Sequence, residues 1–297
     1  MKSDNIPVYL LMSPMLIGFL LFTIYPILYV IRWAWFDYDG FSQAKFIGLD
    51  NFIRLFTRDS NYWISIFNTF LVTVCKMLIE IPAALILAVL LNSKTRLNNF
   101  FRTMFFMPTI ISTAIVGLIF SILFSSYNGI INVILTNTGL TAEKINWFGD
   151  KWLALFVVVL AAVWSHFGIN MIFILMGLQS VPKELYECAE IDGANALQKF
   201  FRVTVPMLAP ILQIVLMLAI VEGMKMTEMV LVLTNGQPGG QTEVVMTYIY
   251  KYFFSSDAMV GIAQYGYASS LAVVTAVIIG FITVIYLRLS SKMNKIY

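Results

Sequence analysis

Five ionisable side chains lie inside long apolar runs of the sequence, where charge is costly. Lys76 and Glu80 share one run, and Glu222, Lys225 and Glu228 share another. A charged residue at the centre of a hydrocarbon-spanning helix costs about 2.5–3.5 kcal/mol on insertion scales, so such residues pair with one another or face a wet cavity. The chemistry open to them is therefore ion pairing or the recognition of a polar solute.

The spacing of these residues separates the two runs. Lys76 and Glu80 are four apart, which places them on one helix face, so an ion pair is the favoured interpretation. Glu222, Lys225 and Glu228 step by three, so on one continuous helix Lys225 can reach either glutamate while the stripe drifts around the axis. For this stripe, structural pairing and contact with a ligand both stay open.

Ser165, His166 and Asn170 form a third polar group inside an apolar run. Ser165 and His166 are sequence neighbours, which do not face one another on a helix, so a hydrolytic Ser–His pair is not expected. Asn170 lies four residues after His166 on the same face, as a partner for a sugar hydroxyl or, preferably, for an interhelical hydrogen bond. With one histidine and two cysteines in the chain, neither a catalytic residue nor a metal site is predicted.

A short helix is predicted in the polar segment 178–206. Pro182 suits a first turn, Glu184 and Glu187 favour the positive end of the helix dipole, and Gly193 can end the helix. A helix with one apolar face outside the bilayer has something to dock against, although a solvated loop is the alternative. The expected apolar face comprises Leu185, Cys188 and Ala189, and the expected polar face comprises Lys183, Glu184, Glu187 and Asp192.

A second loop, residues 235–241, consists mostly of turn-forming residues. Three glycines and a proline occur in its seven positions, which forces a turn rather than a helix. Taken alone, this composition is that of a connector.

Long apolar helices must position these residues. The chain has 297 residues, of which 60% are hydrophobic and 12% charged, about half the charged share of a soluble protein. Six runs are long enough to cross about 30 Å of hydrocarbon, so the sequence predicts an all-α integral membrane protein with one domain over residues 1–297. The net charge of +3 indicates no nucleic-acid partner. The six predicted spans are approximately residues 10–31, 67–92, 105–124, 152–177, 207–233 and 267–287.

Basic residues are distributed unevenly between the two sets of connecting segments. One set, which includes both termini, has ten Lys and Arg in 60 positions, and the other has seven in 95. The richer set is expected in the cytoplasm. It comprises residues 1–9, 93–104, 178–206 and 288–297. Rings expected at the headgroup level of the other side are Trp33, Trp35, Tyr62, Trp63, Trp147 and Trp152.

The segment 187–206 combines a short motif with a fixed spacing. It reads Glu187-Cys188-Ala189, three residues, Gly193, nine residues, and then VTVP. This pattern resembles the EAA loop of ABC importer permeases at every spacing, with Cys188 where alanine is usual and two valines in place of isoleucine and leucine. Further segments similar to the carbohydrate branch of these permeases are FIGLDNFIRLF (46–56), NTFLVT (68–73), FFMPTIIS (105–112), 163–194 and 232–254.

The resemblance implies a type I ABC importer permease whose loop 178–206 carries a coupling helix seated in a groove of a cytoplasmic ATPase. In such a permease Glu187 would contact the ATPase, and Gly193 would let the chain turn sharply. The implied ATPase-coupling residues are Glu184, Glu187, Ala189, Asp192 and Gly193. The implied substrate-cavity candidates are Asn170, Glu222, Lys225 and Glu228, and the implied binding-protein contacts are Gly236, Pro238 and Gly239.

The resemblance also sets the expected partners. No Gly-Lys dipeptide occurs in the sequence, so the P-loop pattern is absent and ATP and Mg²⁺ are expected on a separate subunit. The chain itself is expected to bind no cofactor and not to be an enzyme. Implied partners are a second permease in a heterodimer, two ATPase subunits, an extracellular or periplasmic binding protein, a carbohydrate and membrane lipid. The implied location is the plasma (inner) membrane of a prokaryote, with both termini cytoplasmic.

The predicted function is import of a carbohydrate, with an oligosaccharide favoured. A glycerol-3-phosphate-type permease is the first alternative, but a phosphate would favour basic residues in the cavity, and only Lys76 and Lys225 are available. An ion-coupled secondary transporter would explain the intramembrane charges but not the spacing of the 187–206 motif.

Overall fold

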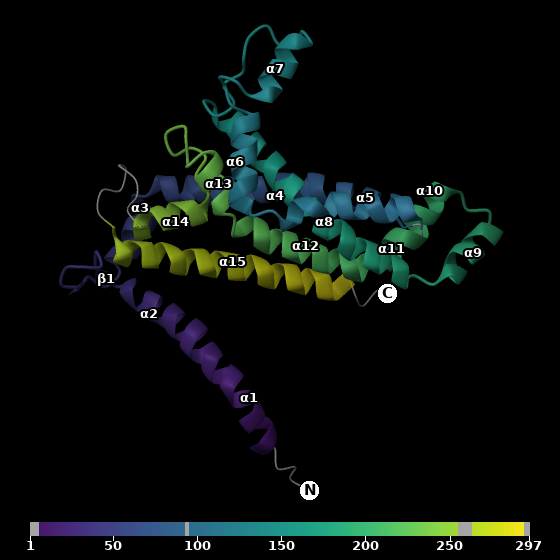
Figure 1. Cartoon of the computed structure of the whole chain (residues 1–297). Coiled ribbons are helices and arrows are strands. Elements are labelled where there is room, and N and C mark those ends of the chain that lie inside the picture. The colour runs from purple at the N-terminus through teal and green to yellow at the C-terminus, as the bar shows by residue number, and fades with distance from the viewer. Residues whose placement is uncertain (1–5, 93–94, 255–262, 294–297) are drawn as a thin grey trace. The chain divides into compact units, whose positions relative to one another are not determined.

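The chain is mostly helical in the computed structural model, which describes residues 6–92, 95–254 and 263–293 (Figure 1). The ends of the single domain predicted over 1–297 lie outside the described residues. The described residues pack into two compact units. The first unit lies within Met1–Ser60 and Tyr248–Ile278, and the second lies within Asn61–Thr247 and Ile279–Tyr297. The prediction of one permease domain stays a prediction.

The first unit begins with a long apolar helix. This helix has 28 residues, which continue from α1 through a π-helical turn, η1, into α2. Pro26 lies in the first turn of α2, where its missing N–H costs nothing. Phe36 of β1 pairs with Phe46 of β2 in a short antiparallel ladder. The elements are α1 (Ile6–Phe19), η1 (Leu20–Ile24), α2 (Tyr25–Trp33), β1 (Phe36–Asp37), β2 (Lys45–Phe46), α3 (Asp50–Thr57), most of α14 (Val245–Phe254) and the first half of α15 (Tyr265–Met293).

Polar contacts around Asp59 connect α3, α14 and α15. Asp59 accepts hydrogen bonds from the hydroxyls of Tyr248 at 2.8 Å and Tyr267 at 2.5 Å. The guanidinium of Arg54 lies 3.9 Å from the ring centre of Tyr267. Burial raises the pKa of the Tyr248 phenol, so this ring stays a neutral donor to Asp59.

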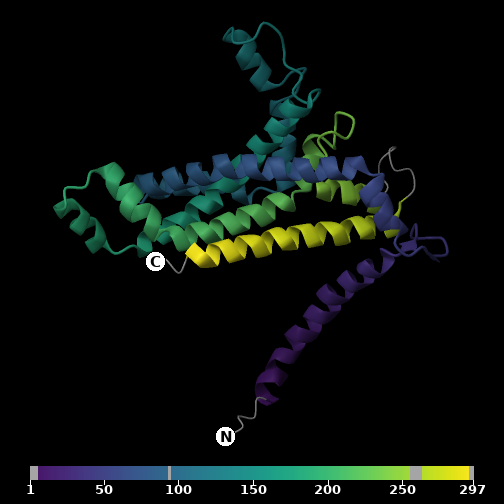
Figure 2. The same ribbon diagram turned by 180° about the vertical axis from the view of Figure 1, so that it is seen from behind.

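The second unit contains the helices that carry the polar residues of the sequence. In Figures 1 and 2, α4, α8 and α12 run alongside one another, with α9 and α10 at one end and the 235–241 turn at the other. The elements are α4 (Ser60–Leu90), α5 (Arg96–Phe106), η2 (Met107–Ile110), α6 (Thr113–Leu123), α7 (Ile130–Asn137), α8 (Lys151–Ser180), α9 (Lys183–Ile191), α10 (Ala196–Lys199), η3 (Phe200–Thr204), α11 (Val205–Met207), α12 (Ala209–Met224) and α13 (Glu228–Leu233).

Four of the six predicted spans are confirmed as continuous helices of spanning length and composition. They are Tyr9–Trp33, Ser60–Leu90, Lys151–Ser180 and Tyr265–Ser291, whose ends lie within seven residues of the predicted bounds. Among the described residues, the other two candidate spans are helix pairs bent by more than 40°. Which face of the membrane holds the termini stays a prediction.

The predicted span 105–124 is not one straight helix. The helical segment starts at Arg96, and its axis turns by 96° between Leu97–Ile110 and Thr113–Leu123. Ile111 and Ser112 adopt extended backbone angles, directly after the 3₁₀ turn that holds Pro108. Residues 105–124 contain no charged residue, so the overall hydropathy of the run conceals the break.

The predicted span 207–233 is also not one straight helix. Ala196–Met207 and Ala209–Met224 meet at 69°, beside Pro206 and Pro210, which have no N–H for a helical hydrogen bond. At the other end α12 stops at Met224, Lys225 caps it, and α13 starts only at Glu228.

Two of the six predicted headgroup-level rings lie in the core instead. Tyr62 is fully buried in α4, and Trp147 is 8% exposed and donates from Nε1 to Asn132 at 3.1 Å. A ring beside an apolar run can anchor a span or fill a core, and the sequence gives the same signal for both.

One glycine permits unusually close packing in the second unit. A Cβ on Gly168 of α8 would lie 2.2 Å from the carbonyl oxygen of Phe105 and 3.0 Å from the Cα of Phe106. The backbones of α8 and α5 are therefore in direct contact, as small residues allow between membrane helices.

Candidate functional site

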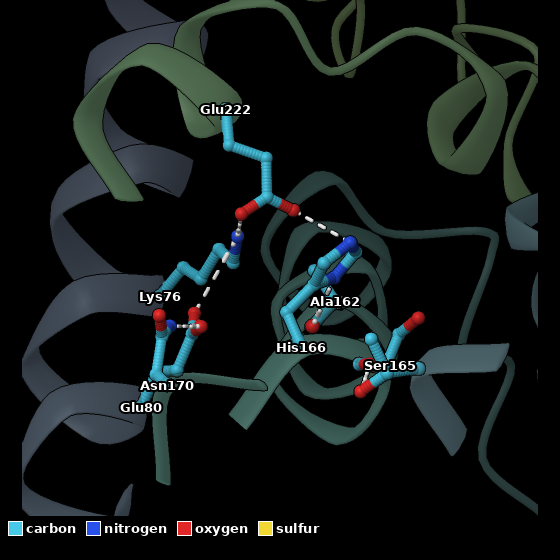
Figure 3. A network of polar contacts seen from close by, with 8 residues as sticks. Lys76, Glu80, Ala162, Ser165, His166, Asn170 and Glu222 are labelled. Carbon is cyan, nitrogen blue, oxygen red and sulfur yellow. Dashed lines mark hydrogen bonds and ion pairs between the residues drawn. The ribbon is translucent and has the colours of Figure 1, made fainter. Parts of the chain in front are cut away.

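Three helices of the second unit bring five polar side chains together (Figure 3). Lys76 and Glu80 come from α4, His166 and Asn170 from α8, and Glu222 from α12. We call these five residues the polar cluster. Each occupies an otherwise apolar helix, so the cluster supplies the pairing that buried charge requires.

Glu222 stands at the centre of the polar cluster because both of its oxygens are engaged. Its Oε2 lies 3.1 Å from the Nζ of Lys76, and its Oε1 lies 2.6 Å from the Nε2 of His166. Lys76 Nζ also lies 3.4 Å from Glu80 Oε2, so the predicted pair four residues apart is confirmed. One lysine thereby joins two carboxylates from different helices.

Asn170 completes the cluster on the side away from Glu222. Its Nδ2 donates a hydrogen bond to Oε1 of Glu80. The interhelical hydrogen bond favoured from the sequence is therefore present. Asn170 is only 3% exposed, and its amide is occupied by Glu80 rather than by an open cavity.

The polar cluster has a dry end and an open end. The side chains of Lys76 and Glu80 are completely buried, whereas 37% of the Glu222 side chain and 25% of that of His166 are exposed. A cavity of about 380 Å³ lies at the open end. Its lining includes Thr113, His166, Glu222, Lys225, Met226, Thr227, Glu228 and Met229.

The predicted stripe of three charges on one helix is wrong, although its members stay close to the cavity. Because α12 ends at Met224, Lys225 and Glu228 lie on the break and on α13. The cation paired with Glu222 is Lys76 of α4. All three predicted residues nevertheless line the same cavity.

Sequence reasoning missed the contacts of His166. It assigned no partner to this residue, whereas Nε2 faces Glu222 and Nδ1 lies 3.1 Å from the carbonyl oxygen of Ala162. His166 and Glu222 are on different helices, so spacing along the chain carries no signal for their contact.

The predicted helix after residue 182 is confirmed as α9, which Pro182 precedes and Asp192 caps. Gly193 follows with a φ of +76°, a left-handed conformation that favours glycine. Of the residues named for coupling, Glu184, Glu187, Asp192 and Gly193 are exposed and Ala189 is half-buried.

Two contacts hold α9 to the segment that follows it. The hydroxyls of Tyr186 and Thr204 lie 3.1 Å apart, and Lys199 Nζ lies 2.6 Å from Glu190 Oε1. Leu185 and Cys188 of the predicted apolar face remain exposed. That face is therefore open to a partner.

The predicted turn at 235–241 is confirmed. Asn235, Gly236, Gly239 and Gly240 all have positive φ. Gly236 is buried, half-buried Pro238 and exposed Gly239 follow it, and Thr242 Oγ1 donates to the Gln237 carbonyl at 2.7 Å. Gly236 therefore shapes the turn from inside, so among the three predicted contact residues only Pro238 and Gly239 present a surface.

Replacing Gly236 by alanine is expected to loosen this turn. The new Cβ would lie 2.0 Å from Oε1 of Glu243 at a φ of +82°, so it meets both a clash and a strained backbone. Gly239→Ala is the matched control, because it has a φ of +57° with nothing within 4 Å. Hydrogen exchange of the amides at 235–243 should quicken far more in Gly236→Ala. Equal exchange in the two variants would contradict this account of the turn.

The sequence was compared with protein families and curated proteins. The family model of the binding-protein-dependent transport system inner membrane component matches residues 80–295. The chain is 34% identical to the probable ABC transporter permease protein YesP of Bacillus subtilis, covering 98% of this chain and 92% of that protein. It is also 34% identical to the arabinooligosaccharides transport system permease protein AraP of Bacillus subtilis, covering 96% and 88%. The trehalose/maltose transport system permease protein MalF of Thermococcus litoralis is 29% identical, covering 94% and 92%.

Solved structures share the fold of the chain. A bacterial ABC transporter that imports the acidic polysaccharide alginate contains a chain that superposes with a TM-score of 0.83 at 24% identity, covering 98% of this chain and 96% of that one. The alginate transporter in complex with a pentasaccharide-bound periplasmic protein gives the same TM-score at 23% identity. The helical fold of this chain is therefore shared with those chains.

Proposed function

The chain belongs to the family of binding-protein-dependent transport system inner membrane components and is a permease subunit of an ABC importer, and we propose that its cargo is an oligosaccharide. The family match over residues 80–295 carries the class. The names of relatives that transport arabinooligosaccharides and trehalose or maltose support the cargo.

Two parts of the second unit are assigned to this cargo, the 235–241 turn and the cavity. The 235–241 turn, with Pro238 and Gly239 at its surface, would meet the loaded binding protein. The cavity beside Glu222, Lys225 and Glu228 would receive the sugar. Of the four predicted cavity residues, Asn170 is better explained as the partner of Glu80.

Coupling to ATP would occur at α9. We propose that α9 docks in a cytoplasmic ATPase subunit through its exposed side, because Leu185, Glu187 and Cys188 are exposed in the described part of the chain. Gly193 lets the chain reverse directly after the helix, and the Glu190–Lys199 pair holds α9 to α10. The residues assigned to ATPase coupling are Glu184, Glu187, Ala189, Asp192 and Gly193.

In the complete importer this chain would pair with a second, related permease, two ATPase subunits that hold ATP and Mg²⁺, and the binding protein. Closure of the ATPase dimer would pull on α9 and open the cavity outward, and hydrolysis would reset it. Motion of rigid elements about an interface is an established way to convert one closure into another. In this scheme both termini lie in the cytoplasm.

Glu187→Ala is expected to uncouple the importer. The chain should be purified with its partners and reconstituted in vesicles, and ATPase activity and sugar uptake measured together. Loss of a charge-assisted contact lowers affinity by about tenfold or more, so sugar-stimulated ATPase activity should fall to near the basal rate. Cys188→Ala is the matched control on the same helix, since alanine is usual there in the EAA motif, and it should keep its coupling.

An assembly with no copurifying ATPase would refute the proposed coupling to a separate ATPase subunit. An ATPase-bearing assembly indifferent to Glu187→Ala would keep the importer and refute only the role of this carboxylate.

A further inference from the structure

The charge balance of the cavity wall indicates what kind of sugar can bind there. We propose that the cavity takes an uncharged, hydroxyl-rich glycan and excludes anionic sugars such as uronates and sugar phosphates, with Glu222 as the hydroxyl-binding residue and Lys76 as the residue that positions it. This inference rests on the proposed function and adds the substrate class. Related permeases include an importer of an acidic polysaccharide, so the class is not given by the fold.

Glu222 keeps free acceptor capacity toward the cavity. A carboxylate has about four lone-pair sites. Lys76 occupies one at Oε2 and His166 one at Oε1, which leaves about one on each oxygen. With 37% of the side chain exposed, these sites are open to two neighbouring hydroxyl donors. An anionic group has acceptors instead of donors to bring, and it would meet a carboxylate of like charge.

Lys76 is present in the polar cluster but is not available to a substrate. Its side chain is completely buried, behind Glu222, and its Nζ lies within 3.4 Å of oxygens from both Glu80 and Glu222. The charge of Lys76 is therefore engaged by two carboxylates. Its effect at the cavity is to fix the direction in which Glu222 presents its open lone pairs.

The remaining charges give no positive surplus. Lys76, Glu80, His166 and Glu222 sum to zero when His166 is protonated and to minus one when it is neutral. Both ring nitrogens of His166 face oxygens, of Glu222 and of Ala162. Among the described residues that line the cavity, Lys225 and Glu228 carry opposite charges that sum to zero. In neither protonation state does the wall attract an anion.

Saturation-transfer NMR on the purified importer assembly tests the proposal directly. The probes are the neutral trisaccharides maltotriose and arabinotriose and the acidic trisaccharide trigalacturonate. At least one neutral probe is expected to bind about tenfold or more tightly than trigalacturonate, because an unpaired charge in a cavity loses its hydration without compensation. This comparison requires no substitution, so it holds even where a variant fails to fold.

Glu222→Gln then tests the assigned residue. It should weaken binding of the neutral probe about tenfold or more and narrow the preference over trigalacturonate, a change of specificity that simple destabilisation would not produce. Glu143→Gln, an exposed carboxylate outside the cavity, should change neither affinity by more than about twofold. Preferential binding of trigalacturonate, or unchanged specificity in Glu222→Gln, would overturn the inference. An assembly with sugar-stimulated ATPase activity that binds no neutral probe would also overturn the inference. An assembly with no ATPase would instead refute the proposed coupling to an ATPase subunit.

Discussion

Lys76→Met is expected to destabilise the protein more than any other substitution considered. It leaves the buried carboxylate of Glu80 without its cation and sets it near Glu222, whose charge Lys76 also balances. Breaking a buried ion pair by removing one partner costs about 3–5 kcal/mol, because the other charge stays buried and uncompensated. The midpoint of thermal unfolding of the purified chain, followed by loss of monodisperse protein, should fall sharply.

The double variant Lys76→Met/Glu80→Gln is the control for this interpretation. It removes the pair together, and a glutamine oxygen can still accept the hydrogen bond from Asn170. Replacing both partners of a buried pair is often close to neutral, so most of the lost stability should return. If Lys76→Met alone unfolds at the wild-type temperature, the contacts of Lys76 with Glu80 and Glu222 do not stabilise the protein.

Gly168→Ala is expected to have the second largest effect, with a sign opposite to that of an ordinary helical substitution. Alanine is favoured over glycine inside a helix by about 1 kcal/mol. At this position, however, its Cβ would fall 2.2 Å from the backbone carbonyl of Phe105, which cannot rotate away as a side chain could. Overpacking of this kind costs about 1–3 kcal/mol and should push α5 away from α8.

Gly280→Ala in α15 is the matched control. It is also a helical glycine, but nothing lies within 4 Å of the added Cβ. It should leave the unfolding midpoint unchanged or raise it slightly. A Gly168→Ala protein at least as stable as Gly280→Ala would show that α8 and α5 do not approach as closely as described.

Features set by neighbouring residues could be predicted from the sequence. The pair of Lys76 and Glu80 follows from a spacing of four, and α9 follows from Pro182 before it and Gly193 after it. The 235–241 turn follows from its glycines. In each case the physical cause lies within about ten residues, so the pattern along the chain contains it.

Features set by packing could not be predicted in this way. The contacts of Glu222 with Lys76 and His166 join residues far apart in the chain, and the sequence offered Lys225 as a nearer and equally charged partner. The end of α12 at Met224 decided between them. The extended backbone at Ile111 likewise interrupts a run that has no charged residue and a high overall hydropathy, so the composition of the run did not indicate the break.

The unbroken course of α8 has a mechanical consequence. A helix rises about 1.5 Å per residue, so the 14 residue steps from His166 to Ser180 form a strut of about 21 Å between the polar cluster and the end of α8, just before α9. A hydrogen-bonded strut of this length is stiff along its axis, so a pull on α9 would arrive at His166 with little loss. Because Lys76 and Glu80 belong to a different strut, α4, such a pull would be felt as shear across the Glu222 and Asn170 contacts. In the proposed scheme, motion of the ATPase subunits would therefore reach Glu222, the residue proposed to bind the cargo.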